Sequence, residues 1–180
     1  MTLEATAQGS DPNPTGLEYS THVQTPGGRF VEVQFLSVGD LVLARGEETS
    51  GIAPCAIARY LERSRVEFVR VVTQSDIAGA DSIGTTPGTP FWVQGRGWIE
   101  ARSLTAGDVL DSINGVRTVV SGVFDEGHKT EVFSIEVEGL HTFFAGNHGV
   151  RVHDTGNIAP MATASSGSPA VASPPAVGRD

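Results

Sequence analysis

An internal repeat constrains the fold of this chain more than any other feature. Residues 30–42 and 98–110 align without a gap at a constant offset of 68 positions, as Gly39 and Gly107 show. Both copies read aromatic, aliphatic, Glu, three variable residues, Leu, hydroxyl, small, Gly, Asp and two aliphatic residues. Two copies are too few for a solenoid, which needs about three repeats to bury a continuous core. The repeat therefore predicts a pseudo-twofold domain built from a duplicated β unit.

Short segments rich in Val, Ile and Phe, bounded by Gly, Pro, Asp and Ser, indicate an all-β fold. The expected strands are Phe30–Phe35, Asp40–Arg45, Ala56–Glu62, Val66–Thr73, Pro90–Gln94, Gly107–Asp111, Arg117–Phe124, Thr130–Val137, His141–Ala145 and Val150–His153. No segment shows a sustained apolar period of 3.6 residues, so we expect only one short helical turn, at Ala101–Leu104. The duplication favours a compact, curled sheet over an open sandwich.

The composition along the chain predicts one domain with two polar flanks. Apolar residues are concentrated between about Val31 and Val152, which is enough for a single core. Residues 1–15 are polar with Gly and Pro, and we expect a flexible leader. Residues 155–180 are rich in Pro, Ala and Ser, and we expect a disordered tail. The folded domain should therefore span residues 16–154.

Charge and composition exclude several classes of partner. The formal net charge of −9 argues against nucleic acid or anionic lipid, because binding phosphate requires clustered Lys and Arg. The chain contains no run of 18 apolar residues, so we expect no transmembrane helix. The first residues lack the basic region and the apolar region of a signal peptide. The single cysteine, Cys55, cannot form an internal disulfide, and the compartment is therefore unknown. We expect a monomer without cofactor or metal whose partners are its own flanking polypeptide segments.

Three features occur in order along the chain: the repeat, the T-x-x-x-P-F-W-V turn at residues 86–93, and the end VEGLHTFFAGNHGVRVHD at residues 137–154. Together they resemble a Hint domain, the fold shared by inteins, Hedgehog C-terminal domains and the pretoxin-Hint modules of bacterial polymorphic toxins. The resemblance is closest to the pretoxin-Hint group and covers roughly residues 15–155. It implies a Hint fold and an autoprocessing activity on the domain's own backbone.

The resemblance also implies a set of reactive groups. In such domains a Cys at the start of the first strand attacks the preceding carbonyl and converts an amide to a thioester. A T-x-x-H turn polarises and protonates that amide. At the far end a His assists cyclisation of a terminal Asn, which cuts the chain before a Cys, Ser or Thr. These steps combine a nucleophile, a general acid–base and stabilisation of an amide oxygen within one molecule.

The N-terminal half of this site is degenerate here. The family start reads C-x-x-x-x-T-x-V, and its last two conserved positions fall on Thr21 and Val23. The cysteine position then falls on Gly16, which has no nucleophile. In the T-x-x-H turn, Thr86 is present but Thr89 replaces the histidine. We therefore expect the N-terminal step to be lost.

The C-terminal half is better preserved. His153 and Asp154 stand where the family has His-Asn, and Thr155 is acceptable after the cut. His141 matches the family's late histidine or aspartate position. A carboxylate cyclises poorly unless it is protonated, and the usual pKa of aspartate is about 3.9. The sequence predicts at most slow cleavage at Asp154–Thr155, by a single-turnover autoproteolysis. The alternative is a catalytically inert structural or presentation domain of a larger secreted polypeptide.

Most of these residues also have a purely structural interpretation. Thr86 can be a turn residue, His141 a hydrogen-bonded core histidine, and His153 an exposed strand residue. Trp92 and Trp98 are expected to anchor the core. Cys55 is expected to be a small apolar filler or a loop residue.

Two other chemistries fit short motifs. Asp154, Thr155 and Gly156 spell D-T-G, the motif of aspartic proteases, but such enzymes need a second carboxylate from a duplicated half or a dimer. His141, His148 and His153 suggest zinc, but they lack a fixed ligand spacing. If the Hint geometry holds instead, then Thr86, Thr89, His141 and His153 should converge near Gly16 and Asp154.

Overall fold

The computed structural model describes residues 14–154, and these form the all-β fold that the sequence predicts. Two 3-10 helices, η1 (Val33–Phe35) and η2 (Ala101–Ser103), accompany the strands. The strands are β1 (Leu17–Glu18), β2 (His22–Thr25), β3 (Arg29–Glu32), β4 (Leu41–Ala44), β5 (Ala53–Ser75), β6 (Gly79–Thr85), β7 (Pro90–Val93), β8 (Gly97–Glu100), β9 (Val109–Leu110), β10 (Thr118–Val137), β11 (Thr142–Ala145) and β12 (Val150–His153). Nearly all of the expected leader and the whole of the expected tail lie outside the described residues.

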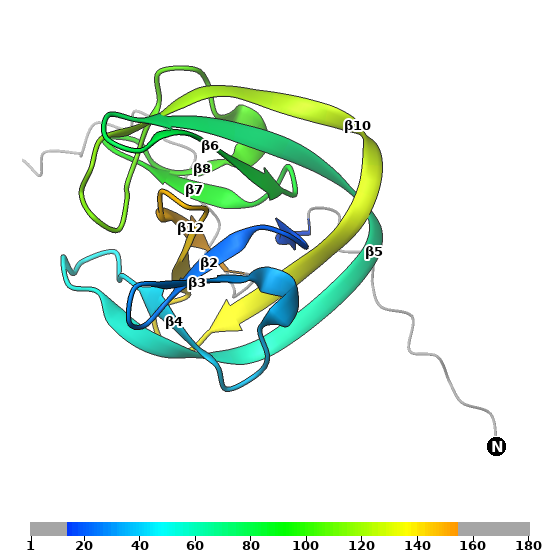
Figure 1. Ribbon diagram of the computed structural model, residues 1–180, viewed down its shortest axis with the longest axis vertical. Coiled ribbons are helices and arrows are strands. Elements are labelled where there is room, and N and C mark those ends of the chain that lie inside the picture. The colour runs from blue at the N-terminus through cyan, green and yellow to red at the C-terminus, as the bar shows by residue number, and fades with distance from the viewer. Residues whose placement is uncertain (1–13, 155–180) are drawn as a thin grey trace, which may run out of the picture.

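Two long antiparallel strands, β5 and β10, form the frame of the molecule. Their pairing runs from Ser75 opposite Thr118 to Ile57 opposite Val137. Figure 1 shows them side by side, curving around one side of the fold from one half to the other. The pairing register shifts at four places, and such bulges bend strands without ending them. The curled sheet expected from the repeat is therefore present.

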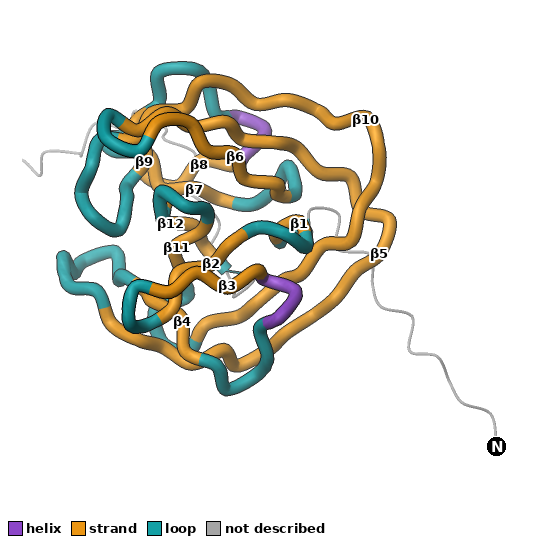
Figure 2. The backbone as a smooth tube through the Cα atoms, viewed as in Figure 1, coloured by secondary structure: helices purple, strands orange, loops and turns teal. Residues whose placement is uncertain are grey.

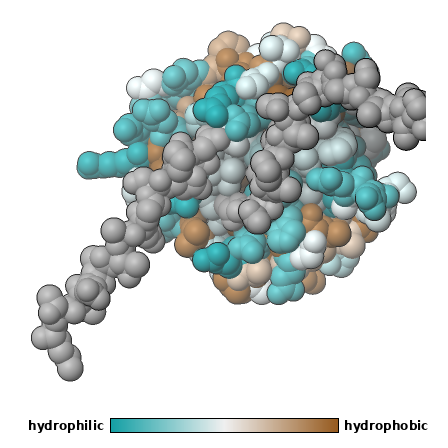
Figure 3. All heavy atoms as spheres, turned by 180° about the vertical axis from the view of Figure 1, so that it is seen from behind, coloured by the Kyte–Doolittle hydropathy of each residue, from teal (hydrophilic) through white to brown (hydrophobic). Residues whose placement is uncertain are grey.

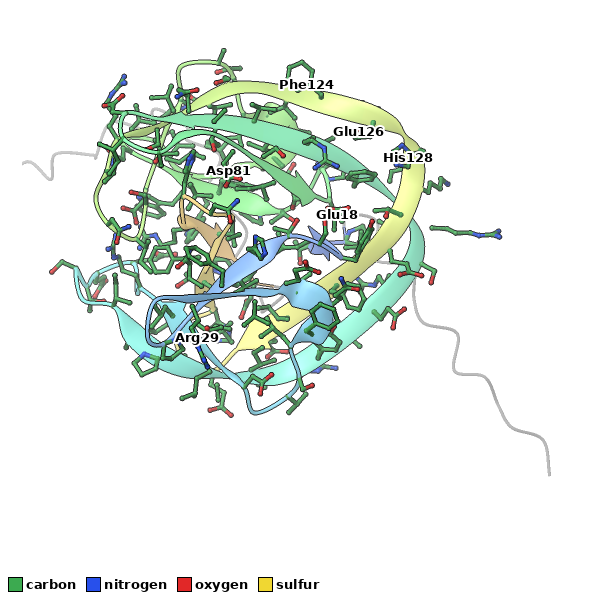
Figure 4. All side chains as sticks on the ribbon, viewed as in Figure 1. Glu18, Arg29, Asp81, Phe124, Glu126 and His128 are labelled. Atoms are coloured by element: carbon green, nitrogen blue, oxygen red, sulfur yellow. The ribbon has the colours of Figure 1, made fainter. Side chains whose placement is uncertain are left out.

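The sequence analysis was wrong to divide each long strand into two. It placed breaks at 63–65 and 125–129, whereas β5 and β10 run through both places. The reasons are local irregularities that do not stop the pairing. Arg65 adopts a positive φ of 59° within β5, and the register shifts between Asp125 and Lys129 in β10. Figure 4 shows Glu126 and His128 on this part of β10.

The internal repeat corresponds to a duplicated unit, β2–β3–η1–β4 and β7–β8–η2–β9. The turns after the two 3-10 helices are equivalent. The Asp40 carboxylate accepts from Ser37 N at 2.8 Å, and the Asp108 carboxylate accepts from Thr105 N at 2.9 Å. Gly39 and Gly107, at φ 91° and 99°, allow this turn in both copies. Figure 2 shows η1 and η2 in opposite halves of the molecule, as a pseudo-twofold requires.

The helical turn at η2 was expected, at Ala101–Leu104, but its equivalent in the first copy was not. The expected strand Phe30–Phe35 ends at Glu32, and the last three residues form η1. The sequence analysis also missed β1, β2, β6 and β8. Gly, Asp, Ser and other residues with weak strand propensity interrupt several of these segments, and their pairing with neighbouring strands makes them strands.

The sheet topology brings the two ends of the domain together. The strand order is β3-β2-β11-β12-β7-β9-β10-β1-β6-β5-β4, with β8 paired to β7. The central hairpin β11–β12 joins the two repeated units, since Ala145 lies opposite Val23 and Val152 opposite Phe91. Strand β1 lies between β10 and β6, with Leu17 opposite both Phe133 and Thr85. The start and the end of the domain thus both enter the middle of the sheet.

A single main core fills the space that the strands enclose. Its members include Leu17, Val33, Ile57, Phe91, Leu110, Ile135 and Val152. Trp92 and Trp98 are only half-buried and do not belong to this core, so the expectation that they anchor it was wrong. On the face seen in Figure 3, the hydrophobic residues not covered by grey atoms lie in small separate groups. Within residues 14–154, no helix is long and apolar enough to cross a membrane.

Candidate active site

The domain meets its flanking segments at Thr15–Gly16 and after Asp154, and we call these two places its junctions. Both lie at one small hollow. Gly16 precedes β1 and Asp154 follows β12, and both line the hollow together with Thr15, Thr89, Ser134 and His153. Its cavity volume is about 10 Å³, which is close to what one water molecule needs. Of the four residues expected to converge at the two ends, Thr89 and His153 line this hollow.

The turn that follows β6 holds both peptide groups of Gly16. Gly16 N donates to Thr89 Oγ1 at 3.0 Å, and Thr86 N donates to Gly16 O at 3.0 Å. Thr85 Oγ1 donates to the same carbonyl at 2.9 Å. The hydroxyls of Thr86 and Thr89 are 2.8 Å apart. This turn therefore orients the Thr15–Gly16 amide, and the residue in contact with the amide nitrogen is the one at the family's histidine position.

A side chain at position 16 would have no room. A Cβ atom built on Gly16 would lie 2.5 Å from Val132 Cγ1 and 2.9 Å from Ser134 Oγ. Ser134 Oγ donates a hydrogen bond to Thr15 O, the carbonyl oxygen that precedes Gly16. The sequence analysis identified Gly16 as a missing nucleophile, but did not identify Ser134, because nothing near residue 134 marks it as a partner of residue 15.

The Asp154 side chain is buried and held by several groups, with a residue exposure of 1%. Its Oδ2 atom accepts from Val137 N at 2.6 Å and lies 3.2 Å from His141 Nδ1. Its backbone nitrogen donates to His141 O at 2.9 Å. These bonds fix the carboxyl group at the end of β10 and compensate for its burial. His141 adopts a positive φ of 54°, and its side chain is 44% exposed, so it is not a core histidine.

His153 lies against the carbonyl that would be cut. Its Nδ1 atom is 3.2 Å from Asp154 O and 3.6 Å from Asp154 Oδ1. Burial lowers the pKa of His153, but the hydrogen bonds and the charge of Asp154 outweigh burial and raise it above the ordinary value. Its side chain is only 10% exposed, so the exposed-strand interpretation was wrong. A protonated His153 can donate to Asp154 O and polarise that carbonyl.

The His153 ring packs against Trp98, which is in turn in contact with charged side chains. The Trp98 ring meets it edge to face, with 5.0 Å between centroids. Trp98 Nε1 donates to Glu47 Oε1 at 2.6 Å, and the Arg151 guanidinium lies 4.4 Å from the centre of the Trp92 ring. Burial lowers the pKa of Arg151, which the nearby Asp111 and Glu47 charges partly oppose. Sequence reasoning assigned no role at this site to Glu47, which belongs to no motif, or to Arg151, which lies within the 137–154 motif but carries no obvious chemistry there.

The other residues that the sequence analysis considered either lie away from this site or fall outside the described residues. His148 Nδ1 lies 3.0 Å from Thr73 Oγ1, in the β11–β12 turn. Across residues 14–154, no three His, Cys, Asp or Glu side chains are grouped as metal ligands would be. Cys55 is half-buried in β5, where burial raises its pKa. Thr155 and Gly156 lie outside the described residues.

Comparison with known proteins agrees with this geometry. The family model of the pretoxin HINT domain matches residues 23–155. A bacterial intein-like domain from Clostridium thermocellum is 27% identical, with a TM-score of 0.68, over 77% of this chain and 98% of that one. A DnaB intein from Synechocystis, 18% identical, has a TM-score of 0.67 over 79% of this chain and 99% of that one, and shares the fold. No curated protein gave a match. Because the family model covers most of its length, the chain belongs to the pretoxin Hint family.

Proposed function

We propose that this chain is a self-processing domain that acts once, as a monomer, and cleaves its own backbone after Asp154. The observation that supports this most strongly is the contact between His153 Nδ1 and Asp154 O at 3.2 Å. In this contact His153 can donate a hydrogen bond to the carbonyl oxygen of Asp154, the residue whose own side chain carries a carboxyl group. The substrate is the flanking polypeptide, so no external substrate is required.

The reaction uses the Asp154 carboxylic acid as the nucleophile. A side-chain oxygen attacks the Asp154 carbonyl carbon and closes a five-membered cyclic anhydride. The bond from that carbon to Thr155 N breaks, and the nitrogen takes the proton of the carboxylic acid and leaves as an amine. Water then opens the anhydride and regenerates Asp154 with a free α-carboxylate. His153 stabilises the negative charge that develops on Asp154 O.

The family's N-terminal step cannot run through residue 16. Gly16 has no side chain, and the Thr89 hydroxyl is a poor proton donor to an amine leaving group. Ligation of the two flanks requires an acyl group transferred from the N-terminal flank, so we expect no splicing through residue 16. This leaves hydrolysis at the C-terminal junction as the main reaction.

The test is incubation of the full chain, tagged at both ends, at about pH 5 and about pH 8, on either side of the ordinary histidine pKa. We expect slow release of a fragment that ends at Asp154, measured by intact mass, and faster release at the acidic pH. Asp154→Asn should accelerate cleavage, because a carboxamide closes to a succinimide, which the leaving amine attacks less readily than the anhydride that Asp154 forms. His153→Ala should slow it. His148→Ala is the matched control, since His148 lies in the same hairpin but contacts Thr73.

The alternative is an inert domain that presents the rest of a larger secreted polypeptide. The Val137 N–Asp154 Oδ2 bond of 2.6 Å favours it, because this bond must break or shift before the carboxyl group can attack. An unmodified chain and an Asp154→Asn variant that both stay intact at both pH values would support the inert domain and contradict the proposed cleavage.

A further inference from the structure

Ser134 occupies the place of the missing nucleophile at the other junction. It lies in β10, is 2% exposed, and its Oγ donates to Thr15 O. A Cβ atom on Gly16 would fall 2.9 Å from the same Oγ. The hydroxyl of residue 134 therefore stands where a side chain of residue 16 would reach, beside the acyl group of the Thr15–Gly16 bond.

The rest of the junction is held as an acyl transfer requires. The leaving nitrogen, Gly16 N, is fixed by its bond of 3.0 Å to Thr89 Oγ1. The Gly16 carbonyl is fixed by Thr85 Oγ1 and Thr86 N. The hollow beside the bond is also lined by His153, whose ring can take up or release a proton there.

The other hydroxyls of the described site contact different atoms. Thr85 Oγ1 and Thr89 Oγ1 bond to Gly16 O, and Thr86 Oγ1 bonds to Thr89 Oγ1. Ser134 is the hydroxyl bonded to the Thr15 carbonyl, which carries the carbon that would be attacked. Proximity of this kind lets a weak hydroxyl nucleophile act within one molecule.

We propose that Ser134 attacks the Thr15 carbonyl and cleaves the Thr15–Gly16 bond by acyl transfer. The Ser134 Oγ–Thr15 C bond forms and the Thr15 C–Gly16 N bond breaks. The hydroxyl proton passes to Gly16 N, which leaves as the amine of a new N-terminus. The product is a branched chain in which residues 1–15 are esterified to Ser134, and water or an added nucleophile releases them. This revises the expectation that the N-terminal junction is inert.

The test is incubation of the full chain with neutral hydroxylamine, which cleaves esters. We expect a fragment of residues 16–180 with Gly16 at its N-terminus, identified by mass, together with a hydroxamate of residues 1–15. Ser134→Ala should abolish it. Ser134→Cys should give the same fragment faster with an added thiol, because a thioester replaces the ester. Ser112→Ala is the matched control, since Ser112 is also buried but bonds to Val116 O.

Several outcomes separate this inference from its rivals. Hydroxylamine also cleaves Asn-Gly bonds at alkaline pH, so any fragment that begins at Gly115 is a side product and should not depend on Ser134. A folded Ser134→Ala variant that still releases residues 16–180, or an unmodified chain and a Ser134→Cys variant that both stay intact at Thr15–Gly16, would overturn the proposal. Cleavage after Asp154 gives residues 1–154, so failure of either reaction is scored independently.

Discussion

At the scale of single residues, Gly16 is closely packed by its neighbours. It has no side chain, and Val132 and Ser134 occupy the space that a Cβ atom would need. Placing any side chain at position 16 is therefore a packing problem. His153 and Asp154 also act on each other directly. Asp154 raises the pKa of the His153 ring, and the ring nitrogen Nδ1 contacts the Asp154 carbonyl oxygen.

The first prediction concerns the space at Gly16. Gly16→Ala places a Cβ 2.5 Å from Val132 Cγ1, so either side chain or backbone must move. We expect it to lower the free energy of unfolding by about 1–3 kcal/mol, the usual effect of overpacking a core. Combining it with Val132→Ala should restore part of that loss, so the two changes should be non-additive. Urea unfolding of the two single variants and the double variant measures this. Strict additivity would show that the two positions do not compete for space.

The second prediction concerns pH. The pKa of His153 is raised because Asp154 outweighs burial, so the folded state binds a proton more tightly than the unfolded state, in which the histidine pKa is about 6.5. Its stabilising contribution is fully present below that value and is lost as pH rises through the folded-state pKa. Asp154→Asn should lower the pKa of His153, measured by NMR titration of the ring protons, and reduce the loss of stability over this range. An unchanged pKa in the variant would show that a group other than the Asp154 carboxylate, such as Glu47, outweighs burial.

At the scale of elements, the hairpin β11–β12 connects the two repeated units and carries the C-terminal junction. Its turn is fixed from outside by Asp81 of β6, labelled in Figure 4. Asp81 accepts from Asn147 N at 2.7 Å, from Asn147 Nδ2 at 3.0 Å and from His148 N at 3.3 Å. One carboxylate therefore holds the turn that sets where the hairpin, and with it His153, lies.

The third prediction tests that anchor. Asp81→Ala should lower the free energy of unfolding by about 2 kcal/mol, because it removes hydrogen bonds to a charged acceptor. The amides of Asn147 and His148 should exchange with solvent faster, measured by hydrogen exchange. Asp76→Ala is the control, since Asp76 is an exposed acidic residue in the β5–β6 turn. Equal exchange in both variants would show that β2 and β7 alone hold the hairpin.

At the scale of the whole molecule, the long strands β5 and β10 keep the two units in place, and β1 and β12 bring the two junctions together. Thr15 and Asp154 line one hollow, so the ends of the domain are neighbours in space. This arrangement places both ends of the domain beside the same side chains, Thr89, Ser134 and His153.

The fourth prediction follows from those neighbouring ends. A circular permutant that joins Asp154 to Thr15 through a short Gly/Ser linker and opens at the β5–β6 turn, where Ile77 is 79% exposed, should fold. We expect a circular dichroism spectrum and a single unfolding transition close to those of the unmodified domain. Opening the chain at Arg65, inside β5, should instead abolish cooperative unfolding. If both permutants fold equally well, the continuity of β5 is not required.

The sequence alone determined the features that depend on local chemistry. The all-β class follows from short segments rich in Val, Ile and Phe that turn residues bound. The duplicated unit follows from Gly and Asp residues that make one turn twice, at Gly39–Asp40 and Gly107–Asp108. Only the tertiary structure decided that β5 and β10 are continuous through their bulges and that β1 inserts between β10 and β6. It also decided that Ser134 meets the carbonyl of Thr15, 119 positions away. Such contacts arise because strands far apart in the sequence pair with each other, and a local sequence pattern does not specify which strand will be its partner.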